Sequence, residues 1–214
     1  MSAVRLPDYG RPNLEFAKPA EPARLERVAR ALEARGIHAL VADSAEHAKR
    51  VVLDMVPGGA EVHVALSETM AKLGISAQID ESGRYDSVRS KLKKLDRETQ
   101  RREMRKLGAA PDYMLGSAHA ITDDGVILVA SGSGSQLGAH AYAAGKVILA
   151  VGHQKIVRDL EEGLRRIREY ALPLEDARMK ANGRPGTLLT KILVIEGEPG
   201  GRISVVLIPE TIGF

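Results

Sequence analysis

The chain has 214 residues, of which 44% are hydrophobic and 28% charged, with a net charge of +3 and a pI near 9.2. This length fits one sizeable α/β domain or two small ones, and the apolar fraction suffices for a buried core. Because cysteine is absent, disulfides, thiolate catalysis and cysteine-held iron–sulfur clusters are excluded. The weak basicity does not by itself indicate a nucleic-acid partner.

Residues 1–20 are predicted to be an N-terminal arm, because they contain Pro7, Gly10, Pro12 and Pro19 and show little apolar pattern. Residues 21–214 are then expected to form one α/β domain. The sequence shows no signal peptide and no apolar run of about 18 residues. We therefore expect a cytoplasmic protein without a membrane span.

Helix and strand patterns alternate along most of this domain. In chain order, the patterns predict a helix at 22–35, a strand at 37–41, a helix at 44–55, a strand at 61–66, a short helix before Gly74, a long basic helix at 87–107, a strand at 126–130, a helix at 136–144, a strand at 147–151, a helix at 157–170 broken by Pro173, and strands at 192–195 and 203–208 around a hairpin-like turn. Such alternation favours a mostly parallel central sheet with helices on both faces, ending in a C-terminal β pair.

A glycine–serine turn, Ser131-Gly132-Ser133-Gly134-Ser135, follows one of these strands and leads through Gln136 into a helix. Glycines let backbone N–H groups approach a ligand, and a helix start adds positive potential, so the turn predicts a pocket for an anion. The alternative is a tight strand–helix turn whose serines only cap the helix. The sequence is neither a Walker A loop nor a G-x-G-x-x-G fingerprint.

Three further segments are candidates for the same crevice, which lies at the carboxyl ends of strands in parallel sheets. Ser67-Glu68-Thr69 opens a helix, where it could bind an anion or present Glu68 as a base, or simply cap the helix. Asp124-Gly125 precedes a strand and is either a binding element or a plain turn. Lys155 follows a strand and could neutralise an anionic ligand, or be solvated.

Two other groups of side chains are less specific. The six histidines show no metal-binding spacing, so no metal site is predicted. The basic residues of 87–107 are a solvated face, a surface for an acidic partner, or a cover for an acidic ligand. Nucleic acid is not expected, because no binding motif is present and no aromatic residues interleave with the charges.

Four blocks of the sequence together resemble the LUD domain family of lactate utilisation proteins. These blocks are AITDDGVILVASGSGSQ, GKVILAVGHQKIVRDLEEGLRRI, LPLEDAR and RISVVLIPETIGF. The resemblance extends from Leu115 to Phe214 and more weakly from about Pro22. It implies a fold like that of ribose-5-phosphate isomerase, glucosamine-6-phosphate deaminase and CoA transferases.

The resemblance also implies a role in oxidising L-lactate to pyruvate beside partner subunits that carry iron–sulfur clusters. Family pocket positions correspond to Asp124, Gly125, Gly132, Gly134, Lys155 and Arg178. The chain departs from many relatives because Met179–Thr190 lacks cysteines, so any cluster has to belong to a partner and no intrinsic cofactor is expected. His119 and Gln154 also stand where relatives often have Asn, which affects ligand specificity.

Three functional hypotheses follow. The first is a lactate utilisation subunit that binds a small anionic metabolite through residues 131–136 and Lys155. The second is an independent enzyme for a sugar phosphate or CoA ester, with Glu68 or Asp124 as acid/base or nucleophile. The third is a non-catalytic scaffold whose basic helix docks an acidic partner. Whether the chain forms a homo-oligomer is left open.

Overall fold

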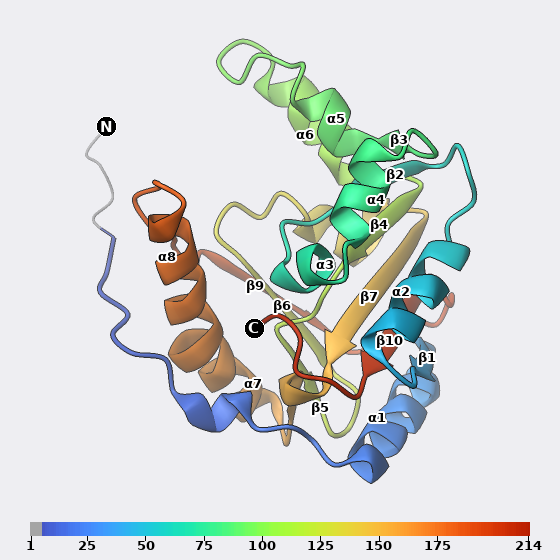
Figure 1. The fold of residues 1–214 in the computed structure, drawn as a ribbon, viewed down its shortest axis with the longest axis vertical. Coiled ribbons are helices and arrows are strands. Elements are labelled where there is room, and N and C mark those ends of the chain that lie inside the picture. Colours follow the sequence, from blue (N-terminus) through green and yellow to red (C-terminus); the bar gives the residue numbers. More distant parts are fainter. Residues whose placement is uncertain (1–5) are drawn as a thin grey trace.

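The computed structural model describes residues 6–214 of the chain (Figure 1). The helices are η1 (Leu14–Ala17), α1 (Pro22–Ala34), α2 (Ala45–Asp54), α3 (Glu68–Lys72), α4 (Ile75–Glu81), α5 (Val88–Leu92), α6 (Arg101–Ala109), η2 (Ala139–Ala143), η3 (His153–Lys155), α7 (Leu160–Arg166), η4 (Ile167–Ala171) and α8 (Leu172–Ala181). The strands are β1 (His38–Val41), β2 (Glu61–Val64), β3 (Asp86–Ser87), β4 (Tyr113–Gly116), β5 (Ala120–Thr122), β6 (Ile127–Ser131), β7 (Lys146–Gly152), β8 (Ile156–Val157), β9 (Lys191–Ile195) and β10 (Ile203–Ile208).

Six strands form one all-parallel sheet in the order β1-β10-β7-β4-β2-β3. Its longest strand, β7, is buried from Val147 onward, as expected for a strand covered on both faces. Successive side chains point to opposite faces, so Ile148 and Ala150 enter one hydrophobic cluster while Val147 and Leu149 enter another. The predicted α/β fold with a mainly parallel central sheet is confirmed.

A second, smaller sheet has the order β8-β5-β6-β9 and mixes parallel and antiparallel pairs. Both predicted C-terminal strands form, but they do not pair with each other. β9 lies antiparallel to β6 in the small sheet, whereas β10 lies between β1 and β7 in the large sheet. The predicted hairpin-like turn is therefore a crossing between two sheets.

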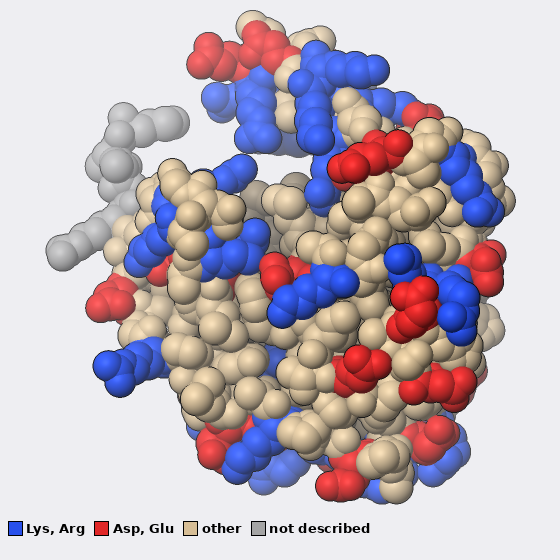
Figure 2. All heavy atoms as spheres, viewed as in Figure 1, with Lys and Arg blue, Asp and Glu red and all other residues tan. Residues whose placement is uncertain are grey.

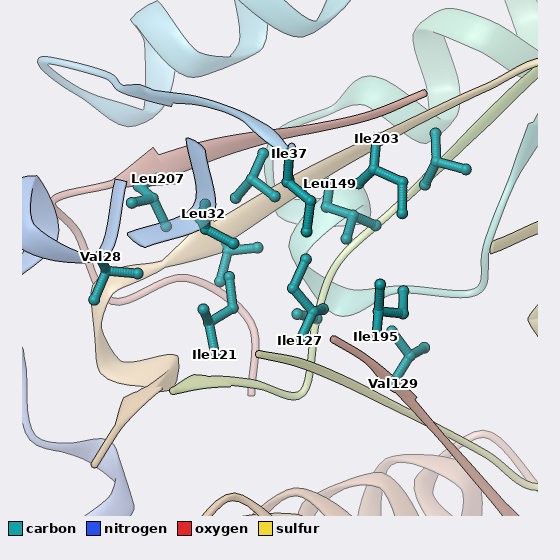
Figure 3. Packing of buried hydrophobic residues seen from close by; sticks show 14 of the residues in the cluster. Val28, Leu32, Ile37, Ile121, Ile127, Val129, Leu149, Ile195, Ile203 and Leu207 are labelled. Atoms are coloured by element: carbon teal, nitrogen blue, oxygen red, sulfur yellow. The ribbon is translucent and has the colours of Figure 1, made fainter. Parts of the chain in front are cut away.

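The elements stack in four layers. Helices α2, α3 and α4 cover one face of the large sheet, around Val52, Met70 and Ile79. The other face packs against α1 and the small sheet, where Leu32 and Ile127 belong to the same cluster (Figure 3). The outer face of the small sheet is covered by the α7–η4–α8 segment. This layering fixes where the carboxyl ends of the parallel strands emerge.

The predicted basic helix over 87–107 is wrong, because the chain forms a β3–α5 segment, a turn and the separate helix α6. Asp96 explains the break. Its carboxylate accepts hydrogen bonds from the Glu98 N–H (2.8 Å) and the Thr99 hydroxyl (2.9 Å), which offers the backbone an alternative to the helix. Helices α5 and α6 project from the body of the protein (Figure 1), and Figure 2 shows Lys and Arg side chains gathered on this projection.

The predicted break at Pro173 is also wrong. Helix α7 continues through the wider turn of η4 into α8, and Pro173 lies in the first turn of α8. Pro173 cannot donate to the carbonyl of Glu169, four residues before it, and that carbonyl instead accepts the N–H of Asn13 (2.8 Å). Within residues 6–214, no helix is both long enough and apolar enough to cross a membrane.

Candidate functional site

The carboxyl ends of β2, β4 and β7 meet at a point where the direction of the chain through the large sheet changes. From β2 the chain goes outward to the edge strand β3, then returns to place β4 on the opposite side of β2. Ligands of open α/β sheets bind in the crevice beside such a point. The segments that follow β2, β4 and β7 contain Thr69, Ser117 and Lys155, respectively.

The side chain of Lys155 forms hydrogen bonds that connect these three segments. Its Nζ donates hydrogen bonds to Oγ1 of Thr69 (2.9 Å) and to Oγ of Ser117 (3.1 Å), although only 2% of the residue is exposed. Both hydroxyls donate their own hydrogen bonds to backbone carbonyls, Thr69 to that of Ile212 (3.3 Å) and Ser117 to that of Ala118 (3.3 Å). Both therefore act as acceptors toward Lys155.

Burial lowers the pKa of Lys155 well below its usual value, and the charges of Arg166 and Lys72 lower it further. Desolvation disfavours the charged amine, and nearby cations act in the same direction. No carboxylate within residues 6–214 forms an ion pair with Lys155, and no acidic group raises its pKa. Lys155 is thus a buried base without a protein counterion.

Arg166 is a second buried base without an acidic partner in the described part of the chain. Its Nε donates to the carbonyl of Gln154 (3.2 Å) and its Nη1 to the carbonyl of His119, while Nη2 has no hydrogen-bond partner. Its guanidinium also lies 5.1 Å from the ring centroid of Tyr170. Burial lowers the pKa of Arg166 to about 10, so the group stays charged at neutral pH.

His119 and Gln154 hold the surrounding backbone. Nδ1 of His119 accepts the N–H of Ala130 (3.1 Å), and burial lowers its pKa to about 3, so the ring is neutral. Nε2 of Gln154 donates to the carbonyls of Ile212 (3.0 Å) and Gly213 (3.2 Å). Gln154 thereby fixes the C-terminal tail beside Thr69.

A cavity of about 100 Å³ lies beside the first turn of α3. Its lining consists of Leu66, Ser67, Glu68, Ala71, Ser76, Arg89 and Arg178. Ser67 caps the helix by accepting the N–H of Met70 (3.3 Å), and Arg178 pairs with Glu175 at 2.7 Å. The structure therefore brings the predicted residues Ser67, Glu68 and Arg178 to one cavity, and Thr69 in the same helical turn to Lys155.

The glycine–serine turn follows β6 of the small sheet and uses several of its donors internally. Oγ of Ser131 accepts the N–H of Gly134 (2.8 Å), and Oγ of Ser133 accepts the N–H of Ser135 (3.2 Å). The hydroxyls of Ser131 and Ser135 donate to Oε1 of Gln136. Gly132 lies against the backbone of Leu188, where a Cβ would come within 2.7 Å of the carbonyl oxygen. None of these hydrogen bonds joins the turn to Lys155.

Asp124 and Gly125 lie in the turn between β5 and β6, away from Lys155. The β5–β8 register pairs Ile121 with Ile156, so Lys155 is level with Ala120, whereas Asp124 lies in the turn beyond Thr122, the last residue of β5. Asp124 pairs with Arg35 at 2.7 Å, and hydrogen bonding from Thr122 lowers its pKa. The structure therefore does not bring this acid/base candidate to the other predicted residues.

A larger cavity of about 450 Å³ lies between η1 and the region of β8. Its basic side chains all have acidic partners: Lys18 with Glu15, Arg24 with Asp123, Arg158 with Glu162, and Arg165 with Glu169. Charge within this cavity is thus already balanced. Among residues 6–214, no group of three or more acidic, histidine or cysteine residues is arranged to hold a metal ion.

Ser117 and Arg166 were not predicted from the sequence. Ser117 directly follows β4, a strand that the sequence patterns did not predict, so the reasoning that made Ser67 and Lys155 candidates could not reach it. Arg166 gave no such signal, because an arginine beside the apolar positions of a helix is ordinarily solvated. Its burial depends on the docking of α7 against the small sheet.

Comparison with known proteins agrees with this architecture. The LUD domain matches residues 25–197 of the chain. A crystal structure of a DUF162 family protein from Deinococcus radiodurans is similar over 89% of this chain and 99% of that chain, with a TM-score of 0.51 and 16% sequence identity. That likeness concerns the fold. No curated protein matches the chain. Since the matched region covers most of the sequence, the chain belongs to the LUD domain family.

Proposed function

We propose that this protein serves lactate utilisation by binding a small carboxylate beside Lys155 and assisting the oxidation of L-lactate to pyruvate. The LUD domain links the chain to lactate utilisation in general. Because the chain has no cysteine, iron–sulfur clusters with cysteine ligands would belong to partner subunits. The chain would then act as the subunit that holds the metabolite.

One observation carries the proposal: Lys155 and Arg166 are both buried bases without acidic partners within residues 6–214. A buried base without an acidic partner either carries an uncompensated charge or gives up its proton, and both cost free energy, so a protein without use for such a base is usually more stable with an apolar residue. A bound carboxylate would offset this cost. Bases in the larger cavity are already paired, so the same argument does not apply there.

The neighbouring groups suit a small oxygen-rich ligand. Thr69 and Ser117 present hydroxyls on either side of the Lys155 amine. Arg89 and Arg178 border the cavity next to the same turn of α3. Backbone amides of the 131–136 turn that are not bonded internally remain candidate contacts, because His119 bonds to Ala130 at the end of β6 and connects that strand with the segment of Ser117.

Deleting the gene from its source organism is expected to abolish growth on L-lactate as the sole carbon source, while growth on pyruvate persists. Reintroduction of the wild-type gene should restore growth, and reintroduction of a Lys155→Met gene should not. The readout is the growth rate, with equal protein levels checked by immunoblotting. Undiminished growth of the deletion strain on L-lactate would contradict the proposed role.

A further inference from the structure

We propose that Nζ of Lys155 is a nucleophile that forms a reversible imine with the carbonyl carbon of a small 2-oxo acid. This inference rests on the proposed function, since it takes the ligand of the same site to be the 2-oxo acid produced from a 2-hydroxy acid. It goes further because it assigns Lys155 covalent chemistry as well as charge. Two observations support it: the hydrogen bonds of the amine and its surroundings.

The hydrogen bonds around Nζ match those of a neutral amine. A neutral amine has two N–H donors and one lone pair, whereas an ammonium group has three donors and no lone pair. Lys155 has two acceptors, Thr69 and Ser117, whose own protons are committed to carbonyls. No third acceptor within residues 6–214 bonds to Nζ, so the remaining position suits a lone pair available for attack.

The surroundings of the amine favour its uncharged form in the free protein. Desolvation lowers the pKa of Lys155, and the charge of Arg166 adds to this effect. Lysines become nucleophilic near neutral pH by these same two means, burial and a neighbouring cation. Arg166 itself remains charged and can attract the carboxylate of the incoming 2-oxo acid.

The two hydroxyl partners of the amine differ in their surroundings. Ser117 is only partly buried, and its Oγ lies 3.1 Å from Nζ. On the other side, Thr69 belongs to the helical turn whose residues Ser67 and Glu68 line the cavity of about 100 Å³. That volume corresponds to about three water molecules, enough for a ligand of a few heavy atoms.

The reaction needs no oxidant or further reactant. The lone pair of Nζ attacks the carbonyl carbon, and the carbonyl oxygen takes up one proton from the amine to give a carbinolamine. The nitrogen then loses its second proton to this oxygen and forms the C=N bond while the C–O bond breaks, so that the oxygen leaves as water. Thr69 and Ser117 can relay the protons, because each hydroxyl contacts the nitrogen directly.

The test is reductive trapping with pyruvate and sodium cyanoborohydride, followed by intact-mass measurement and peptide mapping. We expect one adduct per chain, located at Lys155. Replacing pyruvate with L-lactate, which has no carbonyl group to attack, should give none. In a Lys155→Arg variant, which keeps the charge but lacks the amine, the adduct should disappear. A Lys72→Arg variant is the matched control and should be trapped like the wild type, because Lys72 is exposed.

Peptide mapping of the wild-type protein shows whether the adduct is at Lys155, even where a variant fails to fold. If calorimetry shows that pyruvate binds but no adduct forms at Lys155, the imine is overturned while the proposed function stands. Adducts scattered over exposed lysines overturn it in the same way. If neither pyruvate nor L-lactate binds, the proposed function and this inference both fail.

Discussion

A Lys155→Met variant is expected to bind L-lactate about 10- to 100-fold more weakly than the wild type while melting at the same or a higher temperature. Charge-assisted hydrogen bonds contribute about 1.5–3 kcal/mol, which corresponds to that loss of affinity. Methionine has a similar length and no charge, so it removes a buried base without leaving a large cavity. Isothermal titration calorimetry and differential scanning calorimetry measure the two quantities.

The pH dependence of L-lactate binding provides a second test of the role of Lys155. A bound carboxylate favours the protonated amine and so raises the pKa of Lys155, which is depressed in the free protein. Binding therefore takes up protons, and wild-type affinity should weaken as pH rises through the window between the free and bound pKa values. The Lys155→Met variant should lack this dependence. A Lys72→Arg variant, which keeps the charge of an exposed basic residue in α3, should bind like the wild type. Equal affinities of the wild type and Lys155→Met would contradict the assignment.

A Gly125→Ala variant is expected to lose about 2–5 kcal/mol of unfolding free energy. Gly125 has a φ of +87°, and an added Cβ would come within 2.8 Å of the α1 backbone at Ala31. The positive φ costs about 1–2 kcal/mol for alanine, and the steric overlap adds about 1–3 kcal/mol. Urea denaturation followed by circular dichroism measures the change.

Gly83→Ala separates the two contributions. Gly83 has a φ of +72°, but an added Cβ would meet no atom within 4 Å. Its substitution should therefore cost only the conformational part, about 1–2 kcal/mol. The folded fraction of Gly125→Ala should still bind L-lactate normally, because the turn lies away from Lys155. Equal costs for the two variants, or loss of binding in folded Gly125→Ala, would show that this account of Gly125 is wrong.

Local signals predicted much of the fold. Ser44 caps α2 by accepting the N–H of His47, and Pro22 stands at the start of α1, as the sequence indicated. The apolar runs at 147–151 and 203–208 form the central strands β7 and β10. These features depend on neighbouring residues, so they can be recognised without knowledge of the tertiary structure.

The errors concern interactions between distant or competing groups. Asp96 bonds to the backbone two residues ahead, a local alternative that outweighs the helical pattern around it. The strands β9 and β10 were expected to pair because they are adjacent in the chain. Each instead pairs with a strand more than 50 residues away, and the choice between sheets depends on packing as a whole.

The site was predicted in part. The position of a residue after a parallel strand identified Ser67, Thr69 and Lys155 as candidates, and the structure places Thr69 and Lys155 in contact. Sequence spacing could not separate the 131–136 turn, which bonds largely to itself, from the loops that meet at Lys155. Nor could it reveal that Lys155 lacks an acidic partner, because that depends on every side chain packed around it.

The most direct test is a crystal structure of the protein grown with L-lactate, which cannot form an imine and so reports binding alone. We predict a lactate molecule whose carboxylate lies within hydrogen-bond distance of Nζ of Lys155, beside Thr69 and Ser117. Lactate bound instead in the cavity beside η1 or at the 131–136 turn, with Lys155 still enclosed by its two hydroxyls, would contradict this account.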